Sequence, residues 1–178
     1  MRGGSLVTNF WQRTTEGTQN GLTWTILDDG AVTCVGVPTS AWCSVSSANV
    51  SVSTLGMHPG RTYTLDSGVK DIHTSAMITF YGADGGKVGE RFDSGTFVLP
   101  TGTDSIVCVL YVQDMVGRQI DLTFKPMLVE GAAAEYVPYA LGGGTSQRTC
   151  GAGMMPLRLK ACASTCSMTA ACRSIMTV

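Results

Sequence analysis

The chain has 178 residues, 44% of them hydrophobic and 14% charged, with a formal net charge of −1 at pH 7. This length is enough for one domain with its own hydrophobic core, and the near-neutral charge argues against a nucleic-acid-binding surface. No apolar run approaches the roughly 18 residues that a membrane-spanning helix needs. The residues that follow Met1 lack the apolar core of a secretory signal, so none is expected.

The composition changes after Ala140. Residues 1–140 contain all 13 acidic residues and 8 of the 12 basic ones, whereas residues 141–178 contain 4 basic residues and no acidic one. The second segment also lacks aromatic residues, yet it holds 4 of the 7 cysteines. We therefore predict a lead-in at 1–7, one folded domain at 8–140, and a Gly-rich linker with a disordered tail at 141–178. A shifted reading frame is an alternative origin for that tail.

A β-hairpin is predicted over residues 22–37. Leu22, Trp24 and Ile26 share one face of its first strand, so Trp24 is expected in the core. The turn is Asp28-Asp-Gly30, where glycine supplies the positive φ that a tight turn needs and Asp caps the backbone. This role in a turn also accounts for the paired carboxylates without any chemistry.

Further short strands are predicted on both sides of the hairpin, separated by turn residues. A lead-in strand at 8–15 should tuck Phe10 or Trp11 under the sheets. The other predicted strands lie at 41–45, 50–55, 61–65, 75–81, 96–99 and 105–113, and residues 16–21 are predicted as a loop. In the last of these strands, one set of alternate residues should face the core and the other set, with Tyr111, the opposite side.

The final strand is predicted from the alternation of apolar and polar residues over 120–128. Pro126 has no N–H for a sheet, so it should lie at an edge or where pairing stops. A turn at Glu130-Gly131 follows. Tyr136-Val-Pro-Tyr139 then reads as an extended segment whose rings close the domain.

Several motifs occur in a specific order: Asn9-Phe-Trp-Gln-Arg-Thr-Thr15, the hairpin, Lys125-Pro-Met-Leu128 and Tyr136-Val-Pro-Tyr139. This order resembles the carbohydrate-binding-module-like jelly-roll domains in minor tail and baseplate proteins of bacteriophages and prophages. The resemblance covers about residues 8–139. It implies an all-β jelly-roll β-sandwich of eight or nine antiparallel strands, located in a virion tail.

The same resemblance implies an accessory module whose partners are other tail or baseplate proteins and a host cell-surface glycan. Sugars bind by stacking their apolar faces on aromatic rings that have polar groups at the rim. Trp42, Tyr81 and Tyr111 are the candidate ligand-binding residues, because their strands can present them on an exposed sheet face. A structural assembly or homo-oligomerisation domain without a sugar ligand is the alternative, and a glycoside hydrolase is a third reading.

No motif indicates catalysis or a cofactor, so the chain is predicted not to be an enzyme. A glycosidase needs two carboxylates at a controlled separation, and no motif nominates Asp71, Glu90 or Asp93 for such a pair. His58 and His73 lack ligand partners at metal-binding spacing. A structural calcium ion in a loop stays open.

The cysteines also favour no metal site. Cys34, Cys43 and Cys108 lie in predicted strands and are expected to be buried free thiols, with a Cys34–Cys43 disulfide as the alternative. The four cysteines of the tail do not have the spacing of a zinc site; they are Cys150, Cys162, Cys166 and Cys172.

Overall fold

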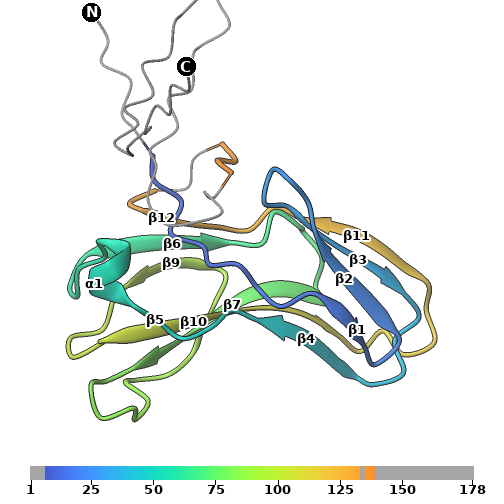
Figure 1. Ribbon diagram of the computed structural model, residues 1–178, viewed down its shortest axis with the longest axis horizontal. Helices are drawn as coiled ribbons and strands as arrows, with labels where there is room; N and C mark the ends of the chain where they lie inside the picture. The colour runs from blue at the N-terminus through green and yellow to red at the C-terminus, as the bar shows by residue number, and fades with distance from the viewer. Residues whose placement is uncertain (1–6, 133–134, 139–178) are drawn as a thin grey trace, which may run out of the picture.

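The computed structural model describes residues 7–132 and 135–138, and these are mostly β-structure in three antiparallel sheets (Figure 1). The four-stranded sheet has the order β1-β2-β3-β11, from Gly17–Gln19, Leu22–Ile26, Val32–Gly36 and Ile120–Phe124. The three-stranded sheet has the order β12-β6-β9, from Met127–Glu130, Thr62–Asp66 and Gly95–Val98.

The five-stranded sheet has the order β4-β10-β7-β8, and β5 also pairs with β10. Its strands are Trp42–Ser46, Ser105–Gln113, Thr74–Tyr81, Phe92–Asp93 and, for β5, Val50–Ser51. In Figure 1 this sheet forms the lower layer, and the other two sheets lie above it. The described part of the chain is thus built from two layers of antiparallel strands.

A single main hydrophobic core lies between the layers, because all three sheets contribute buried side chains to it. Trp24, Ile78 and Leu128 come from different sheets and each is at most 1% exposed. Trp24 stacks on Phe124 with ring centroids 5.8 Å apart. The prediction that Trp24 lies in the core is confirmed, as is the prediction that Trp11 is tucked under the sheets.

The number of strands differs from the expected eight or nine, because the described residues contain twelve. Residues 17–19 form β1 within a segment that was predicted as a loop. Thr18 pairs with Thr23 of β2, and the hydroxyls of these two residues are hydrogen-bonded. The prediction of a strand at 50–55 holds only for Val50–Ser51, which form β5, and is wrong for the residues that follow. The short helix α1 (Val52–Leu55) follows β5 and ends at Gly56, whose left-handed φ of 72° suits a helix end.

Two other strand predictions need correction. Residues 120–130 form two strands in different sheets, β11 and β12, and Lys125-Pro126 between them marks the change of sheet. The prediction that pairing stops at Pro126 is confirmed, since proline has no N–H to donate. The lead-in at 8–15 forms only an isolated bridge between Thr14 and Ser47 rather than a strand.

Cys34, Cys43 and Cys108 are buried free thiols, which confirms the main expectation and not the disulfide alternative. The four tail cysteines and Tyr139 lie outside the described residues. Within the residues that the structure describes, no helix has the length and hydropathy required to cross a membrane.

Candidate functional site

The outer face of the five-stranded sheet carries a second, smaller group of buried side chains. Along β10, Ile106, Cys108, Leu110 and Val112 point into the main core, as the alternation predicted. Val109 and Tyr111 point the other way and pack with Met77 of β7. The half-buried Val107 lies beside them and completes this outer cluster. This face lies at the bottom of Figure 1, on the side of the sheet away from the other layer.

Trp42 and Tyr111 form an aromatic pair on this face. Their ring centroids are 4.5 Å apart and the rings are nearly parallel, with an interplanar angle of 20°. The strand register brings them together, because Trp42 pairs with Gln113 and Tyr111 pairs with Ser44 on adjacent strands. Trp42 is 37% exposed and Tyr111 only 9%, so Tyr111 supports the ring that Trp42 presents to solvent.

Polar groups surround the aromatic pair. The indole Nε1 of Trp42 donates a hydrogen bond of 3.2 Å to Ser44 Oγ. The guanidinium carbon of Arg91 lies 6.0 Å from the ring centroid of Trp42, at the distance of a cation–π contact. Among the described residues, Arg91 has no carboxylate within 4.0 Å. Its guanidinium is therefore available to an incoming polar group.

The surroundings also change the pKa of the Tyr111 hydroxyl. Burial raises the pKa of Tyr111, and the nearby carboxylate of Asp93 raises it further, while a hydrogen bond with Ser75 and the charge of Arg91 lower it. The phenol is thus held in its neutral form, which can both donate and accept a hydrogen bond. Asp93 and Arg91 reach this face because the intervening Phe92 packs against the main core.

The structure places Tyr81 away from the aromatic pair. Tyr81 pairs with Ser105, whereas Ser75, six residues earlier on the same strand, pairs with Tyr111. At the rise of a β-strand, Tyr81 is about 20 Å along β7 from Ser75. Of the three predicted ligand-binding residues, the fold therefore brings together Trp42 and Tyr111 only.

Sequence reasoning did not find Arg91 and Ser94 as members of this site. β8 has only two residues, Phe92–Asp93, which is too short to show an alternating pattern. Ser94 reaches the site through its hydroxyl, which lies 2.7 Å from that of Ser75. Only the pairing of β8 with β7 shows which side of the sheet these residues occupy.

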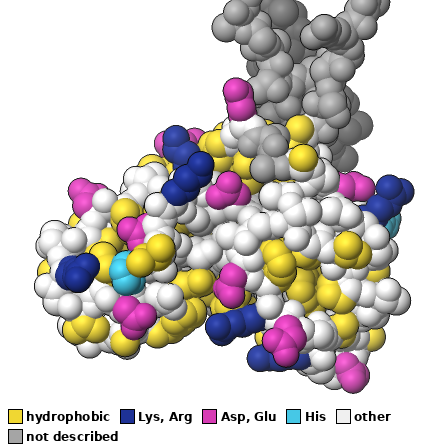
Figure 2. All heavy atoms as spheres, turned by 180° about the vertical axis from the view of Figure 1, so that it is seen from behind, with side chains coloured by type: hydrophobic (Ala, Val, Ile, Leu, Met, Phe, Trp, Pro, Cys, Tyr) yellow, Lys and Arg dark blue, Asp and Glu magenta, His cyan; other side chains and the backbone are white. Residues whose placement is uncertain are grey.

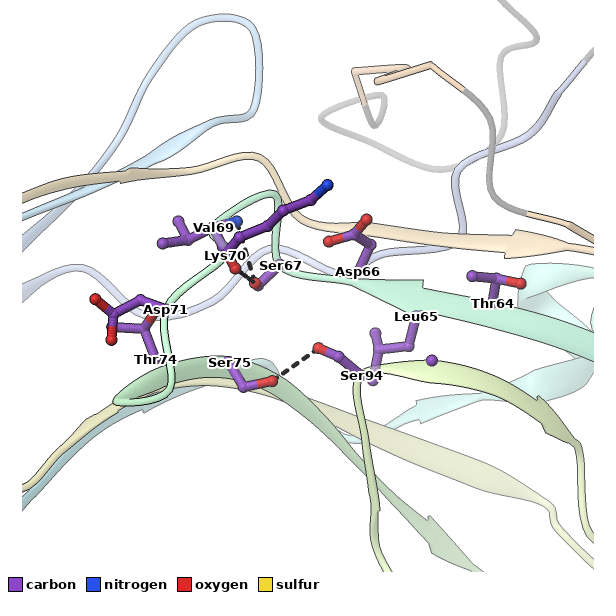
Figure 3. Close-up of a pocket in the computed structure, with 11 residues that line it drawn as sticks. Thr64, Leu65, Asp66, Ser67, Val69, Lys70, Asp71, Thr74, Ser75 and Ser94 are labelled. Atoms are coloured by element: carbon purple, nitrogen blue, oxygen red, sulfur yellow. Dashed lines mark hydrogen bonds between the residues drawn. The ribbon is translucent and has the colours of Figure 1, made fainter.

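A cleft of about 430 Å³ opens at the edge of the five-stranded sheet, between the β6–β7 loop and the start of β7 (Figure 3). Eight of its eleven lining residues have polar or charged side chains. Ser75 and Ser94 form one wall, and Asp66, Lys70 and Asp71 come from β6 and the loop that follows. The lining is Thr64, Leu65, Asp66, Ser67, Val69, Lys70, Asp71, Thr74, Ser75, Ser94 and Gly95.

Metal binding gains no support from the described residues, in which no three His, Cys, Asp or Glu side chains are grouped as a metal site. Asp29 Oδ1 accepts a hydrogen bond from the N–H of Ala31, which is the turn role expected for this pair of carboxylates. His58 is exposed, and His73 is half-buried in the loop before β7.

Charge is mixed over the surface. Figure 2 shows basic, acidic and hydrophobic side chains interspersed over the described part of one face of the molecule. The two ion pairs among the described residues, Arg13–Glu16 and Arg61–Glu130, are both exposed. Exposed pairs of this kind contribute little to stability.

Comparisons with known proteins gave structural similarities only. No protein-family model matches the chain, and no curated protein sequence matches it. A chain of the glycosylation-associated protein complex Gap123 of Streptococcus agalactiae is 19% identical with a TM-score of 0.49, covering 71% of this chain and 45% of that one. This chain thus spans less than half the length of that protein.

Two further solved structures are similar to a comparable degree. A chain in the structure of accessory secretory proteins 1, 2 and 3 of Streptococcus pneumoniae is 16% identical to this chain in sequence, with a TM-score of 0.49. The match covers 74% of this chain and 100% of that one. The enzymatically active domain of tailspike protein 4 of bacteriophage CBA120 is 15% identical with a TM-score of 0.45, covering 66% and 18%. At these values the similarities support neither a shared activity nor shared partners.

Proposed function

We propose that residues 8–140 form a jelly-roll β-sandwich that binds carbohydrate on the outer face of its five-stranded sheet, without catalysis. The observation that carries the proposal is the stacked pair of Trp42 and Tyr111 on that face, with Ser44, Arg91 and Asp93 at its rim. Two layers of antiparallel strands around one core agree with a sandwich.

A sugar ring suits this arrangement chemically. A pyranose has apolar C–H faces that pack on an aromatic ring, and its hydroxyls need donors and acceptors at the rim. Tyr111 occupies one face of the Trp42 indole and Arg91 lies over the indole ring. A bound sugar would therefore rest on Trp42 after Arg91 swings aside, and the guanidinium would then donate hydrogen bonds to the sugar hydroxyls.

The biological setting that we propose is an accessory module of a phage or prophage tail that recognises a host cell-surface glycan. Support comes from the ordered sequence motifs between Asn9 and Tyr139, which resemble the jelly-roll domains of minor tail and baseplate proteins. Other tail or baseplate proteins would be its partners in the virion.

A glycan array followed by titration with host cell-wall polysaccharide tests the ligand. Trp42→Ala should weaken binding about fivefold or more, since the stacking of a nucleic-acid base on an aromatic side chain contributes roughly 1–3 kcal/mol and a sugar face stacks on the ring in the same way. Val98→Ala is the matched control, because Val98 is 58% exposed but lies on β9 of another sheet. Equal loss in both variants, or no loss in Trp42→Ala, would remove the basis of the proposal.

An assembly domain is the second candidate, and the apolar cluster around Tyr111 favours it. Met77, Val109 and Tyr111 face away from the main core, and a neighbouring subunit could cover them together with Trp42. A concentration-dependent oligomer that Trp42→Ala dissociates, with no glycan binding, would support this reading. Release of reducing sugars from host wall material would instead indicate a glycoside hydrolase.

A further inference from the structure

We propose that the cleft at the edge of the five-stranded sheet is a second sugar subsite, which takes the continuation of the oligosaccharide held by Trp42. This inference rests on the proposed function and names its ligand more closely, as an oligosaccharide that crosses the strands and not a single sugar. The cleft volume of about 430 Å³ lies within the range of roughly 300–1,000 Å³ that is typical of small-molecule sites.

The two sites are continuous through Ser75 and Ser94. Ser75 lies directly opposite Tyr111 in the register of β7 and β10, and it also lines the cleft. Its hydroxyl is 2.7 Å from that of Ser94, as the dashed line in Figure 3 shows. From β4, which carries Trp42, to β7 is two strand spacings, or about 10 Å. A short oligosaccharide can bridge that distance.

The carboxylates of the cleft have unused acceptor capacity. Asp66 Oδ1 accepts from the N–H of Gly68 at 2.8 Å, and Asp71 Oδ1 accepts from the N–H of His73 at 2.7 Å. The second oxygen of each carboxylate forms no hydrogen bond or ion pair within the described residues, and Lys70 forms no ion pair there either. Two acceptors beside one ammonium donor match the hydroxyls of a neutral sugar better than an anion.

Thr74 adds a buried polar atom to the lining of the cleft. The residue is 4% exposed, and its Oγ1 has no hydrogen-bond partner among the described residues. It lines the cleft and lies beside Asp71 in Figure 3. Buried hydroxyls are nearly always paired, so a ligand hydroxyl, or a water that the ligand holds, would complete the site at this atom.

The test compares disaccharides and hexasaccharides of β-1,4-linked N-acetylglucosamine, glucose and xylose by titration calorimetry. Asp66→Asn keeps the Oδ1 acceptor for the N–H of Gly68 but removes the charge that faces the cleft. We expect it to weaken hexasaccharide binding about tenfold, the effect of losing one charge-assisted hydrogen bond, and to leave disaccharide binding unchanged. Asp121→Asn is the control, since Asp121 is exposed on β11 of the four-stranded sheet. Trp42→Ala should weaken both lengths.

A second variant, Thr74→Val, keeps the volume and removes the unpaired hydroxyl. We expect a thermal midpoint equal to or above that of the wild type, together with weaker hexasaccharide binding. Unchanged hexasaccharide binding in both cleft variants, with loss in Trp42→Ala, would overturn the second subsite and leave the proposed function standing. If Asp66→Asn lost binding of both the disaccharides and the hexasaccharides while Trp42→Ala kept it, the proposed function and the continuity between the Trp42 site and the cleft would both be overturned. Failure of every probe to bind the wild type would count against both.

Discussion

The side-chain carbonyl of Asn9 accepts a hydrogen bond of 2.9 Å from the backbone N–H of Leu128, 119 residues later in the chain. The same oxygen accepts from the N–H of Trp11, and the amide nitrogen donates to the carbonyls of Pro126 and Val137. One side chain therefore joins the lead-in, the start of β12 and the closing segment. The two ends of the domain that carry the sequence resemblance are in contact through it.

Asn9→Ala should lower the free energy of unfolding by about 2–4 kcal/mol, because it removes four hydrogen bonds and leaves the N–H of buried Leu128 without its acceptor. Urea denaturation measures this change. Asn49→Ala is the control, since Asn49 is exposed and its side chain has no hydrogen bond among the described residues. A difference of less than about 0.5 kcal/mol between the two variants would mean that water replaces the Asn9 amide.

Gly68 lies where the β6–β7 loop passes the link between β11 and β12. A Cβ at this position would lie 2.9 Å from both the backbone nitrogen and the carbonyl oxygen of Lys125, and its φ is +72°. The β6–β7 loop is also hydrogen-bonded to the segment between β11 and β12, because the backbone N–H of Lys125 donates to the carbonyl oxygen of Ser67 at 2.9 Å. The close approach therefore requires a residue without a side chain.

Gly68→Ala should destabilise the domain by more than about 2 kcal/mol, from the backbone clash added to the cost of positive φ. Gly60→Ala separates these two effects. Gly60 also has a positive φ, +82°, but a Cβ there meets nothing within 4 Å, so it should cost only about 1 kcal/mol. Thermal midpoints of the two variants measure the difference, and equal losses would exclude the clash as the cause.

The buried thiols predict a fall in stability at alkaline pH. Burial raises the pKa of Cys34 and of Cys108 from the ordinary value of 9.0 to about 12. Each folded thiol then holds its proton more tightly than the unfolded one. This contribution is fully present below about pH 9, and it is lost as the pH rises toward 12, by about 1.4 kcal/mol per pH unit for each thiol.

Urea denaturation at several pH values between about 9 and 12 measures this slope. The double variant Cys34→Ala/Cys108→Ala should be less stable than the wild type at pH 7, because it leaves cavities in the core. The free energy of unfolding of this variant should fall less steeply with pH than that of the wild type. The cysteines that both proteins retain contribute equally to the two slopes, so their contribution cancels in the difference. Parallel slopes would show that these thiols titrate alike in the folded and unfolded states.

The sequence predicted the parts of the fold that depend on alternation over five or more residues. The alternation in β7 and β10, the hairpin of β2 and β3, and the burial of Trp24 are all confirmed. The pattern failed where elements are short. β1, β8 and α1 have three, two and four residues, and segments of this length are too short to show the period of a strand or a helix.

The candidate site shows the same limit. Trp42 and Tyr111 were predicted to lie on an outer face, since each belongs to a strand with visible alternation. Their stacking depends on the register between β4 and β10, which joins segments more than 60 residues apart. Arg91 and the cleft depend on β8 and on the path of the β6–β7 loop. No local pattern could place them.

The C-terminal boundary gives the last prediction, which compares two truncations. Ending the chain after Ala140 should leave the thermal midpoint within a few degrees, or less than about 1 kcal/mol, because residues 141–178 offer no aromatic anchor to offset the entropy of ordering them. Ending it after Phe124 should abolish cooperative unfolding. That change removes β12, whose Met127, Leu128 and Val129 are each at most 5% exposed. It also removes the hydrogen bond from Tyr136 to the carbonyl of Asp29. Calorimetry of both truncations decides, and a large loss in the longer one would move the domain boundary beyond residue 140.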